Sequence, residues 1–248
     1  MPTIEFIEGD ATNISFIKNS SIDLIITHPP YPLVDSSRYG GLSNKQINHN
    51  HKKFLKLLIK ATKEMERVLK KDGSIWINIG PSADAMPYRY LVGVLDKTNL
   101  YHSSTIIHRN KNAKEIYKNF EGIDEDLWIW FQFTKIEQGF YFNPFKVKKY
   151  NNPIWELDTT NENSEVDLEL KNRHKWEIND TTPKELPERL IEMFSKKGEM
   201  VLDVFSGSAL FPVTAYMLGR NSIGVDISKD QKDLAEKRLE ITKRIGNE

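Results

Sequence analysis

The 248-residue chain carries 35 basic and 35 acidic side chains, so its formal net charge is zero, and 39% of its residues are hydrophobic. This content suffices for one sizeable α/β core, and the neutral balance means that nucleic-acid binding would need a local basic face. The absence of cysteine excludes disulfides, thiolate nucleophiles and cysteine-ligated metal sites. Because neither a signal peptide nor a run of about 18 apolar residues is evident, we expect a cytoplasmic protein without membrane association.

Short apolar runs alternate with helical patterns, which predicts an α/β fold with a doubly wound, mostly parallel seven-stranded sheet. An apolar stripe from Phe54 to Val68 predicts one helix, and Ser228 with Gln231 in capping-box spacing predicts the start of the last helix. The strands are expected at Ile4 to Ile7, Asp23 to Thr27, Ser74 to Ile79, Ser103 to His108, Leu127 to Phe133, Met200 to Val204 and Ser222 to Val225.

Two polar stretches interrupt the α/β rhythm, at residues 32–51 and 134–180. We interpret 134–180 as a small loop-rich insertion that divides a single domain into halves at 1–133 and 181–248. Its basic and aromatic residues suit phosphate and groove contacts, although an ordinary solvated loop has the same composition. The basic residues are Lys146, Lys148, Lys149, Lys171, Arg173 and Lys175.

The second half contains a pattern typical of nucleoside binding. An apolar strand from Val201 runs into a small-residue turn that ends at Ala209, and about 20 residues later a second strand ends at Asp226. The turn lets a ligand approach the backbone, and a carboxylate in that position can accept both ribose hydroxyls. Because Ala209 breaks a G-x-G-x-x-G set, a nucleoside without phosphates fits better than a dinucleotide.

The first half contains a rigid segment, Thr27-His28-Pro29-Pro30-Tyr31, directly after a predicted buried strand. Open α/β sheets bind ligands at this carboxyl edge. The two prolines fix the backbone, so the carbonyls of His28 and Pro29 can be held as acceptors for an amino group. Tyr31 offers a ring face for a base that has left the duplex. Without the nucleoside pattern, the same residues would indicate only a strand terminator or a polyproline segment.

The order of these motifs resembles that of the β-class amino-methylating DNA methyltransferases, in which Asp/Ser/Asn-Pro-Pro-Tyr precedes Phe-x-Gly-x-Gly. Further matches at Gly9-Asp10 and in the segments that begin at Arg67, Thr105 and Pro183 extend the resemblance over nearly the whole chain. The resemblance implies a circularly permuted, Rossmann-like methyltransferase fold. It also implies S-adenosyl-L-methionine as the cofactor, double-stranded DNA as the substrate, and 134–180 as the target-recognition insertion.

The resemblance implies roles for individual residues. The target base would be held by the catalytic residues His28, Pro29, Pro30 and Tyr31. The cofactor would be bound by Asp226 at the ribose, Asp10 at the adenine end, and Phe205, Ser206, Gly207, Ser208, Thr182 and Pro183 at the methionine portion, with Thr27 and Asp203 in the same site. No metal is expected. A cognate restriction endonuclease, and the choice between monomer and homodimer, stay open.

Two residues depart from the family pattern: His28 stands where Asp, Ser or Asn is usual, and Ala209 replaces the second glycine. A neutral imidazole accepts a hydrogen bond from an amino group, whereas an imidazolium only donates. Activity is therefore expected to fall as the pH drops through the pKa of His28. Ala209 is expected to cost little if its φ is negative and to hinder a close backbone approach if its φ is positive.

The implied reaction is direct methyl transfer to the exocyclic amino group of a flipped base, without an enzyme nucleophile. Cytosine N4 is favoured because Thr27, Pro32 and the segments Ile77 to Gly80 and Glu185 to Ile191 resemble the cytosine enzymes more. Adenine N6 and a catalytically inactive DNA-binding relative are the alternatives. Methylation of protein glutamine or RNA adenine is disfavoured, because in those enzymes the catalytic motif follows the cofactor motif.

Several residues receive structural roles only. The histidines lack metal-ligand spacing with carboxylates and are interpreted as scattered surface or core residues; they are His49, His51, His102, His108 and His174. The aromatic run Trp128, Trp130, Phe131 and Phe133 is interpreted as a core strand.

Overall fold

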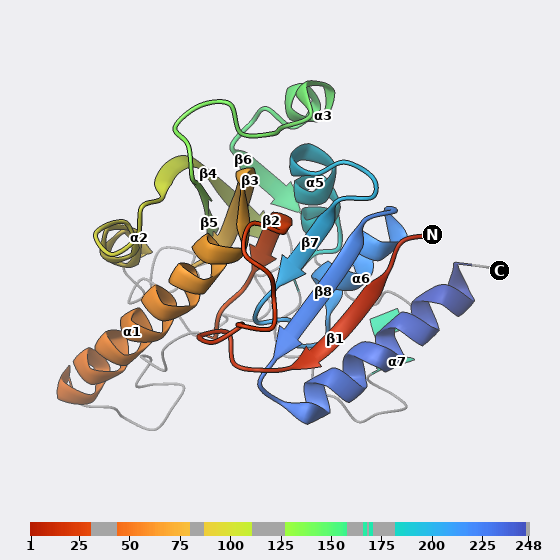
Figure 1. Ribbon diagram of the computed structural model, residues 1–248, viewed down its shortest axis with the longest axis horizontal. Coiled ribbons are helices and arrows are strands. Elements are labelled where there is room, and N and C mark those ends of the chain that lie inside the picture. Colours follow the sequence, from red (N-terminus) through yellow and green to blue (C-terminus); the bar gives the residue numbers. More distant parts are fainter. Residues whose placement is uncertain are drawn as a thin grey trace.

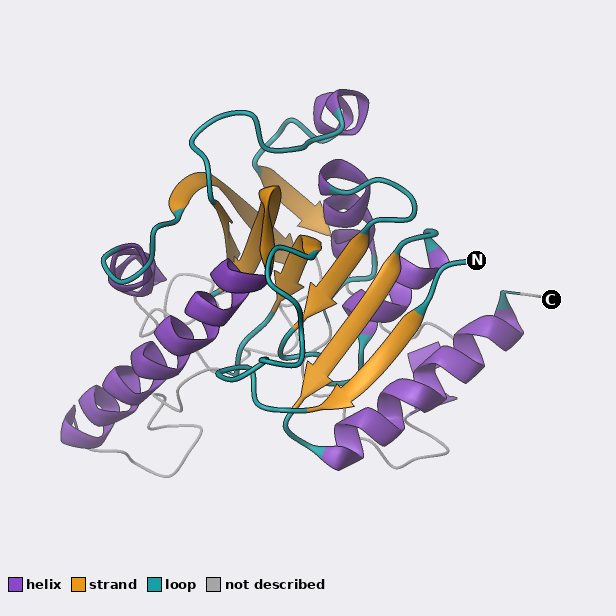
Figure 2. Cartoon of the chain, in the orientation of Figure 1, coloured by secondary structure: helices purple, strands orange, loops and turns teal. Residues whose placement is uncertain are grey.

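The computed structural model describes residues 1–30, 44–79, 87–110, 127–157, 166–167, 169–170 and 182–246. In these ranges the chain forms one mixed sheet with helices on both faces (Figure 1, Figure 2). No helix within them is both long and apolar enough to cross a membrane. Tyr31, His174 and the basic residues Lys171, Arg173 and Lys175 lie outside the described residues.

The sheet has eight strands in the order β1-β8-β7-β2-β3-β5-β4-β6. All neighbours pair in parallel except β5, which is antiparallel to both β3 and β4. The doubly wound, mostly parallel fold is thus confirmed, whereas the predicted count of seven strands is one too few. The strands are β1 (Ile4–Glu8), β2 (Ile22–Thr27), β3 (Leu69–Asn78), β4 (Tyr101–Asn110), β5 (Leu127–Thr134), β6 (Ile154–Leu157), β7 (Met200–Asp203) and β8 (Asn221–Asp226).

The strand that the sequence did not predict is β6, which lies in the region interpreted as a loop-rich insertion, 134–180. It pairs in parallel with the end of β4. Trp155 and Leu157 are buried, whereas Ile154 and Glu156 are exposed. A four-residue strand with two inward side chains gives almost no periodic signal in a polar segment. The first part of the predicted insertion therefore extends the sheet.

The helices cover both faces of the sheet, with α1 in front of it and α6 behind it in Figure 1. The helix α7 packs along β1 and β8, and α3 contacts α5. The apolar stripe predicted from Phe54 to Val68 is buried in α1. The helices are α1 (Asn44–Val68), α2 (Pro87–Leu95), α3 (Pro144–Lys149), α5 (Glu185–Phe194), α6 (Leu210–Met217) and α7 (Lys229–Ile245).

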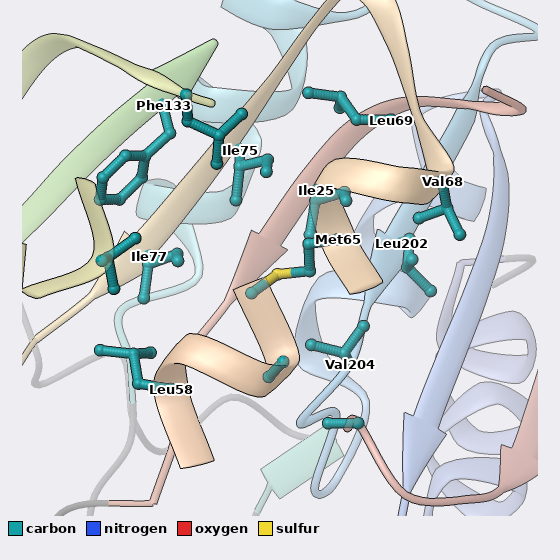
Figure 3. Packing of buried hydrophobic residues seen from close by; sticks show 14 of the residues in the cluster. Ile25, Leu58, Met65, Val68, Leu69, Ile75, Ile77, Phe133, Leu202 and Val204 are labelled. Carbon is teal, nitrogen blue, oxygen red and sulfur yellow. The ribbon is translucent and has the colours of Figure 1, made fainter. Parts of the chain in front are cut away.

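The two faces of the sheet carry separate apolar clusters because successive strand residues point to opposite sides. Ile25 of β2 packs with Leu58 and Met65 of α1 on one face (Figure 3). Leu24 and Ile26, its neighbours in sequence, belong to the cluster under α5 and α6 on the other face. Apolar side chains thus cover both faces of β2, so the strand that precedes the predicted catalytic segment is packed firmly on both sides.

The chain leaves β2 and β7 in opposite directions. From β2 it passes through α1, on one face of the sheet, to β3, which is the neighbour of β2 on the side away from β7. From β7 it passes through α6, on the other face, to β8, which is the neighbour of β7 on the side away from β2. The neighbours β2 and β7 pair only at Leu24 with Val201 and Ile25 with Leu202. We call this junction the switch point. In open α/β sheets, ligands bind at the carboxyl edge of such a junction.

The last helix starts where predicted, but its capping box does not form. Ser228 is the N-cap residue of α7, and its side chain makes no capping hydrogen bond. Its backbone N–H instead donates to Oδ1 of Asp226 at 2.9 Å. The carboxylate at the end of β8 therefore orders the turn into α7, which ties this helix to the predicted cofactor residue.

Candidate active site

The predicted catalytic segment begins at the switch point. Thr27 is fully buried at the end of β2, His28 is half-buried, Pro29 is buried and Pro30 is exposed. The chain thus passes from the core to the surface within four residues. Tyr31, the last member of the predicted motif, lies outside the described residues.

One carboxylate joins this segment to the turn from Phe205 to Ser208. These residues were predicted to bind the cofactor, and we call them the cofactor turn. Thr27 Oγ1 donates to Asp203 Oδ1 at 2.6 Å, and the backbone N–H of Phe205 donates to the same oxygen at 3.1 Å. Burial raises the pKa of Asp203 to about 7, as does the negative charge of Asp226, while the two hydrogen bonds act in the opposite direction. Asp203 was predicted among the cofactor-binding residues; its Oδ1 is engaged within the protein.

His28 packs against aromatic side chains of β5. Its ring centroid lies 5.4 Å from that of Trp128 and 6.3 Å from that of Trp130, both in edge-to-face orientation. Burial lowers the pKa of His28 to about 4. The imidazole is therefore neutral at physiological pH, and a neutral ring retains one nitrogen that can accept a hydrogen bond.

His108, which was interpreted from the sequence as a scattered surface or core histidine, belongs to the same cluster. Its ring stacks on Trp128 at 5.8 Å with an interplanar angle of 4°, and Trp130 Nε1 donates to His108 Nδ1 at 3.1 Å. Trp128 and Trp130 are buried, as predicted for a core strand, yet both also contact His28. The signal that would have found this cluster is the antiparallel pairing of β4 with β5, which places His108 opposite Trp128.

The cofactor turn follows β7 directly. Gly207 has φ +47°, a left-handed conformation, and its backbone N–H donates to Asp226 Oδ2 at 2.9 Å. Ser206 is bonded through its backbone N–H to the carbonyl of Val225. Arg238 of α7 donates through Nε to the carbonyl of Ser208 at 2.7 Å. The turn is therefore fixed by β8 and α7 on both sides.

Pairing of β1 with β8 brings the two predicted nucleoside acids to one edge. Glu8 lies opposite Asp226, and the backbone N–H of Gly9 donates to the carbonyl of Asp226 at 2.8 Å. Asp10 is exposed beside them, and so is the apolar side chain of Ile227. A carboxylate with spare acceptor sites next to an exposed apolar surface fits a ribose and its base.

Two predicted cofactor residues lie in a different place. Thr182 and Pro183 line a cavity of about 210 Å³ together with residues of α6 and α7, among them Thr214 and Arg238. Neither His28, Asp203 nor Asp226 lines this cavity. The described residues therefore bring eleven of the predicted site residues to the switch point and its edge: Asp10, Thr27, His28, Pro29, Pro30, Asp203, Phe205, Ser206, Gly207, Ser208 and Asp226.

Comparison with known families gives the same reading as the motifs. The sequence model of a family described as DNA methylase, with members of N6 and N4 type, matches residues 22–237. This chain belongs to the N6/N4 DNA methylases. The match includes the predicted catalytic segment, the switch point and the cofactor turn.

Relatives and solved structures agree with this membership. The methylase is 31% identical to the Type II methyltransferase M.HpaI of Haemophilus parainfluenzae in an alignment of 232 residues that covers 90% of this chain and 70% of the relative. Its fold is similar to that of the cytosine-N4-specific PvuII DNA methyltransferase, with a TM-score of 0.80 at 18% identity over 96% of this chain and 87% of the other. It is also similar to the M1.HpyAVI–SAM complex, with a TM-score of 0.65 at 20% identity over 96% and 99%.

Of the two departures from the family motifs, the methylase accommodates Ala209 at some cost. Ala209 has φ 62° and ψ 33°, which is the left-handed region that its replacement of glycine was expected to make unfavourable. A non-glycine residue there costs about 1–2 kcal/mol. Its methyl group is fully buried against Val213 and Ala235, and burial of one such group returns about 0.8 kcal/mol. The buried methyl group thus partly offsets the backbone strain.

Proposed function

We propose that this DNA methylase transfers a methyl group to the exocyclic N4 amino group of a cytosine flipped out of double-stranded DNA. The observation that carries the proposal is the meeting of the Thr27-His28-Pro29 segment and the turn from Phe205 to Ser208 at one switch point, where both are bonded to Asp203. Amino-group methylation needs an acceptor for the amino hydrogens and a methyl donor on the opposite side. The two segments are placed to supply these two parts.

The protein's part in the chemistry is to orient the amino group. In this proposal the neutral imidazole of His28 and the backbone carbonyl of His28 or Pro29 accept hydrogen bonds from the two amino N–H groups. As the nitrogen–methyl bond forms, the methyl–sulfur bond of the donor breaks, and the amino nitrogen loses one of its two protons to solvent. Pro30 lacks a backbone N–H that could compete for these acceptors. Trp128 and Trp130 exclude water from one side of His28. Acceptors fixed in advance stabilise the charge that develops on the nitrogen without reorganisation.

The methyl donor is S-adenosyl-L-methionine, which supplies an electrophilic methyl group on a sulfonium when bound. The edge of the sheet at the ends of β1 and β8 fits the nucleoside of this cofactor. Asp226 keeps spare acceptor sites for the ribose, and Asp10 and Ile227 lie beside Asp226. We assign the methionine portion to the turn from Phe205 to Ser208. The places of Thr182 and Pro183 in the adjoining cavity make them candidates for contacts with the end of that portion.

The choice of cytosine rests on sequence and is supported by one structural neighbour. Thr27, the segment that includes Ile77, and the segment that starts at Glu185 resemble the cytosine enzymes more. The PvuII methyltransferase, whose fold is similar over nearly the whole chain, is cytosine-N4-specific. Adenine N6 is the competing product, because the family contains both types.

We further assign recognition of the DNA sequence to residues 134–180. The described part includes α3, whose Lys146 pairs with Glu192 at 2.7 Å, and whose Lys149 lies 4.8 Å over the ring of Tyr150. Lys148 is exposed on the same helix. Such a basic, aromatic surface suits phosphate contacts. Relatives such as M.HpaI are named Type II methyltransferases, which makes a cognate endonuclease a partner worth seeking.

The methylated base identifies the product. DNA made by polymerase chain reaction, and so free of modified bases, is incubated with the protein and S-adenosyl-L-methionine, digested to nucleosides and analysed by mass spectrometry. We expect N4-methyldeoxycytidine in the sample and none in a control without cofactor. N6-methyldeoxyadenosine as the only modified nucleoside would establish the adenine alternative, and no modified nucleoside on DNA of many sequences would contradict the proposed reaction.

Activity is expected to be insensitive to the titration of His28 between pH 5 and pH 8. An ordinary histidine titrates near pH 6.5, whereas burial lowers the pKa of His28 to about 4. The acceptor form is therefore present above about pH 5 and is lost as the pH falls through about 4. An NMR titration of the six histidines measures this pKa. A His28→Asn variant, which has no titrating group there, should show a pH–rate profile parallel to that of the wild type from pH 5 to 8. A profile that differs from it near pH 6.5 would mean that His28 is solvated in solution.

A further inference from the structure

At the switch point, a side-chain hydrogen bond connects β2 and β7 beyond the last paired backbone residues of these two strands. The strands β2 and β7 pair only at Leu24 with Val201 and Ile25 with Leu202, whereas β7 and β8 pair at four positions. Two residues further along β2, the hydroxyl of Thr27 reaches Asp203 across the junction. This bond links residues 176 positions apart in sequence. It lies where the predicted catalytic segment and the cofactor turn leave the sheet.

The carboxylate of Asp203 acts on both segments through a single atom. Oδ1 accepts from Thr27 Oγ1 at 2.6 Å and from the backbone N–H of Phe205 at 3.1 Å. Thr27 is the residue before His28, and Phe205 opens the cofactor turn. Both Thr27 and Asp203 are buried, so water does not compete for the bond. A displacement of either segment would break or bend one of two short hydrogen bonds.

We infer that Asp203 is a positioning residue and not a cofactor ligand: its carboxylate fixes the catalytic segment that starts at Thr27 relative to the cofactor turn that starts at Phe205. The inference rests on the proposed function and adds to it the residue that sets the distance between the catalytic segment and the cofactor turn. Direct methyl transfer requires donor and acceptor atoms about 3–3.5 Å apart and in line, and a misplacement of about 1 Å costs on the order of 10²-fold in rate. The shared oxygen ties the placement of both parts to one side chain.

The matched control lies at the opposite end of the same junction. Asp23 of β2 accepts from the backbone N–H of Met200, the first residue of β7, at 2.9 Å through Oδ2, and Lys70 binds its other oxygen. Asp23 thus also bridges β2 and β7, but far from the predicted catalytic segment. If Asp203 served only to stabilise the junction, an Asp23→Ala change, which removes the acceptor for Met200, would have the same kinetic effect as a change that breaks the Thr27–Asp203 bond.

Three threonine variants isolate the hydroxyl. Thr27→Val keeps the shape of the side chain and removes its donor, and Thr27→Ser restores the donor. Thr62→Val makes the same change at another fully buried threonine, in α1. Thr27→Val is expected to lower the single-turnover rate of methyl transfer about 10- to 100-fold, with the cofactor Kd within about threefold of wild type. Thr27→Ser, Thr62→Val and Asp23→Ala are expected to stay within about threefold of the wild-type rate.

Asp203→Asn tests whether the carboxylate contacts the cofactor. The amide oxygen can still accept from Thr27 and Phe205, so a positioning role predicts a small loss of rate and an unchanged cofactor Kd. A cofactor Kd weakened tenfold or more in Asp203→Asn but not in Thr27→Val would make Asp203 a ligand and overturn the inference. A rate for Thr27→Val within threefold of wild type would overturn it as well.

The two proposals fail in distinguishable ways. If the wild-type protein modifies no DNA, the proposed function fails, and cofactor binding measured by calorimetry still decides the role of Asp203. An unchanged Kd in both Thr27→Val and Asp203→Asn then supports a residue that does not touch the cofactor. If the wild type is active, the rates of the threonine variants test the positioning role directly.

Discussion

Replacing His28 by alanine is expected to lower the single-turnover rate of methyl transfer by about 10²–10³-fold, the loss seen when one preorganised charge-stabilising group is removed from an active site. His28 directly follows Thr27, and its ring lies against Trp128. Its acceptor would orient the amino group only in the reacting complex. The cofactor Kd is therefore expected to stay within about threefold of wild type, so that the loss appears in the chemical step. Rapid-quench transfer of a tritium-labelled methyl group to DNA measures the single-turnover rate, and calorimetry measures the cofactor Kd.

Two variants make this test specific. His28→Asn keeps an acceptor and places a residue usual in the family's motif there, so it should recover most of the lost rate. His102→Ala removes an exposed histidine of β4 and should leave the rate unchanged. A His28→Ala protein as active as the wild type would mean that backbone carbonyls alone orient the base, and the catalytic role of this side chain would be abandoned.

Replacing Trp130 by alanine is expected to lower the free energy of unfolding by about 3–5 kcal/mol and to reduce the rate as well. Trp130 is fully buried, packs edge-on against Phe211 at 5.9 Å, and donates to His108 at 3.1 Å. Its ring also contacts His28. Truncation would therefore leave a cavity in the core and let water reach His28. Urea unfolding followed by fluorescence measures the first effect.

Trp130→Phe separates packing from hydrogen bonding. It keeps most of the ring but not the N–H, so a loss of about 1 kcal/mol is expected. Trp76→Ala, at another fully buried tryptophan that packs on Phe194 at 5.0 Å, should cost a similar free energy of unfolding as Trp130→Ala. Its rate per folded molecule should be that of the wild type. Equal rate losses in the two alanine variants would show that the lower rate comes from general destabilisation and not from loss of the contact between Trp130 and His28.

The sequence predicts the parts of this fold that have long or local signals. The buried runs of β2 and β7 are bounded by turns, so these strands were found with nearly correct limits. The apolar stripe predicted α1 only from Phe54; the helix begins at Asn44, inside the stretch 32–51 that was expected to interrupt the α/β rhythm, because its polar first turns carry no such stripe. The sequence failed at β6, which buries only Trp155 and Leu157. It also failed at the capping box of α7: the backbone N–H of Ser228 donates to the carboxylate of Asp226, from the preceding strand, where the side chain of Gln231 was expected to accept, and the Ser228 side chain makes no capping bond.

The site was predictable where a motif lies in one stretch of chain, and not where it is assembled. The Thr27 to Pro30 segment and the turn at Gly207 were found from local pattern. The Thr27–Asp203 bond and the stack of His108 on Trp128 depend on which strands become neighbours. Such contacts between distant residues follow from topology, which local propensity does not encode.

The pairing of β1 with β8 has a consequence for how the protein acquires its cofactor site. Thr3 and Asn221, bonded to each other at 2.9 Å, lie 218 positions apart, so Asp10 lies beside Asp226 only when two distant parts of the chain have been brought together. Closing so long a loop is slow, whereas the unit from β7 to β8 is local and can form early. A nascent or partly folded chain would therefore lack a complete nucleoside pocket. Cofactor retention then reports on completed folding, and a partly folded molecule that binds DNA would carry no methyl donor to it.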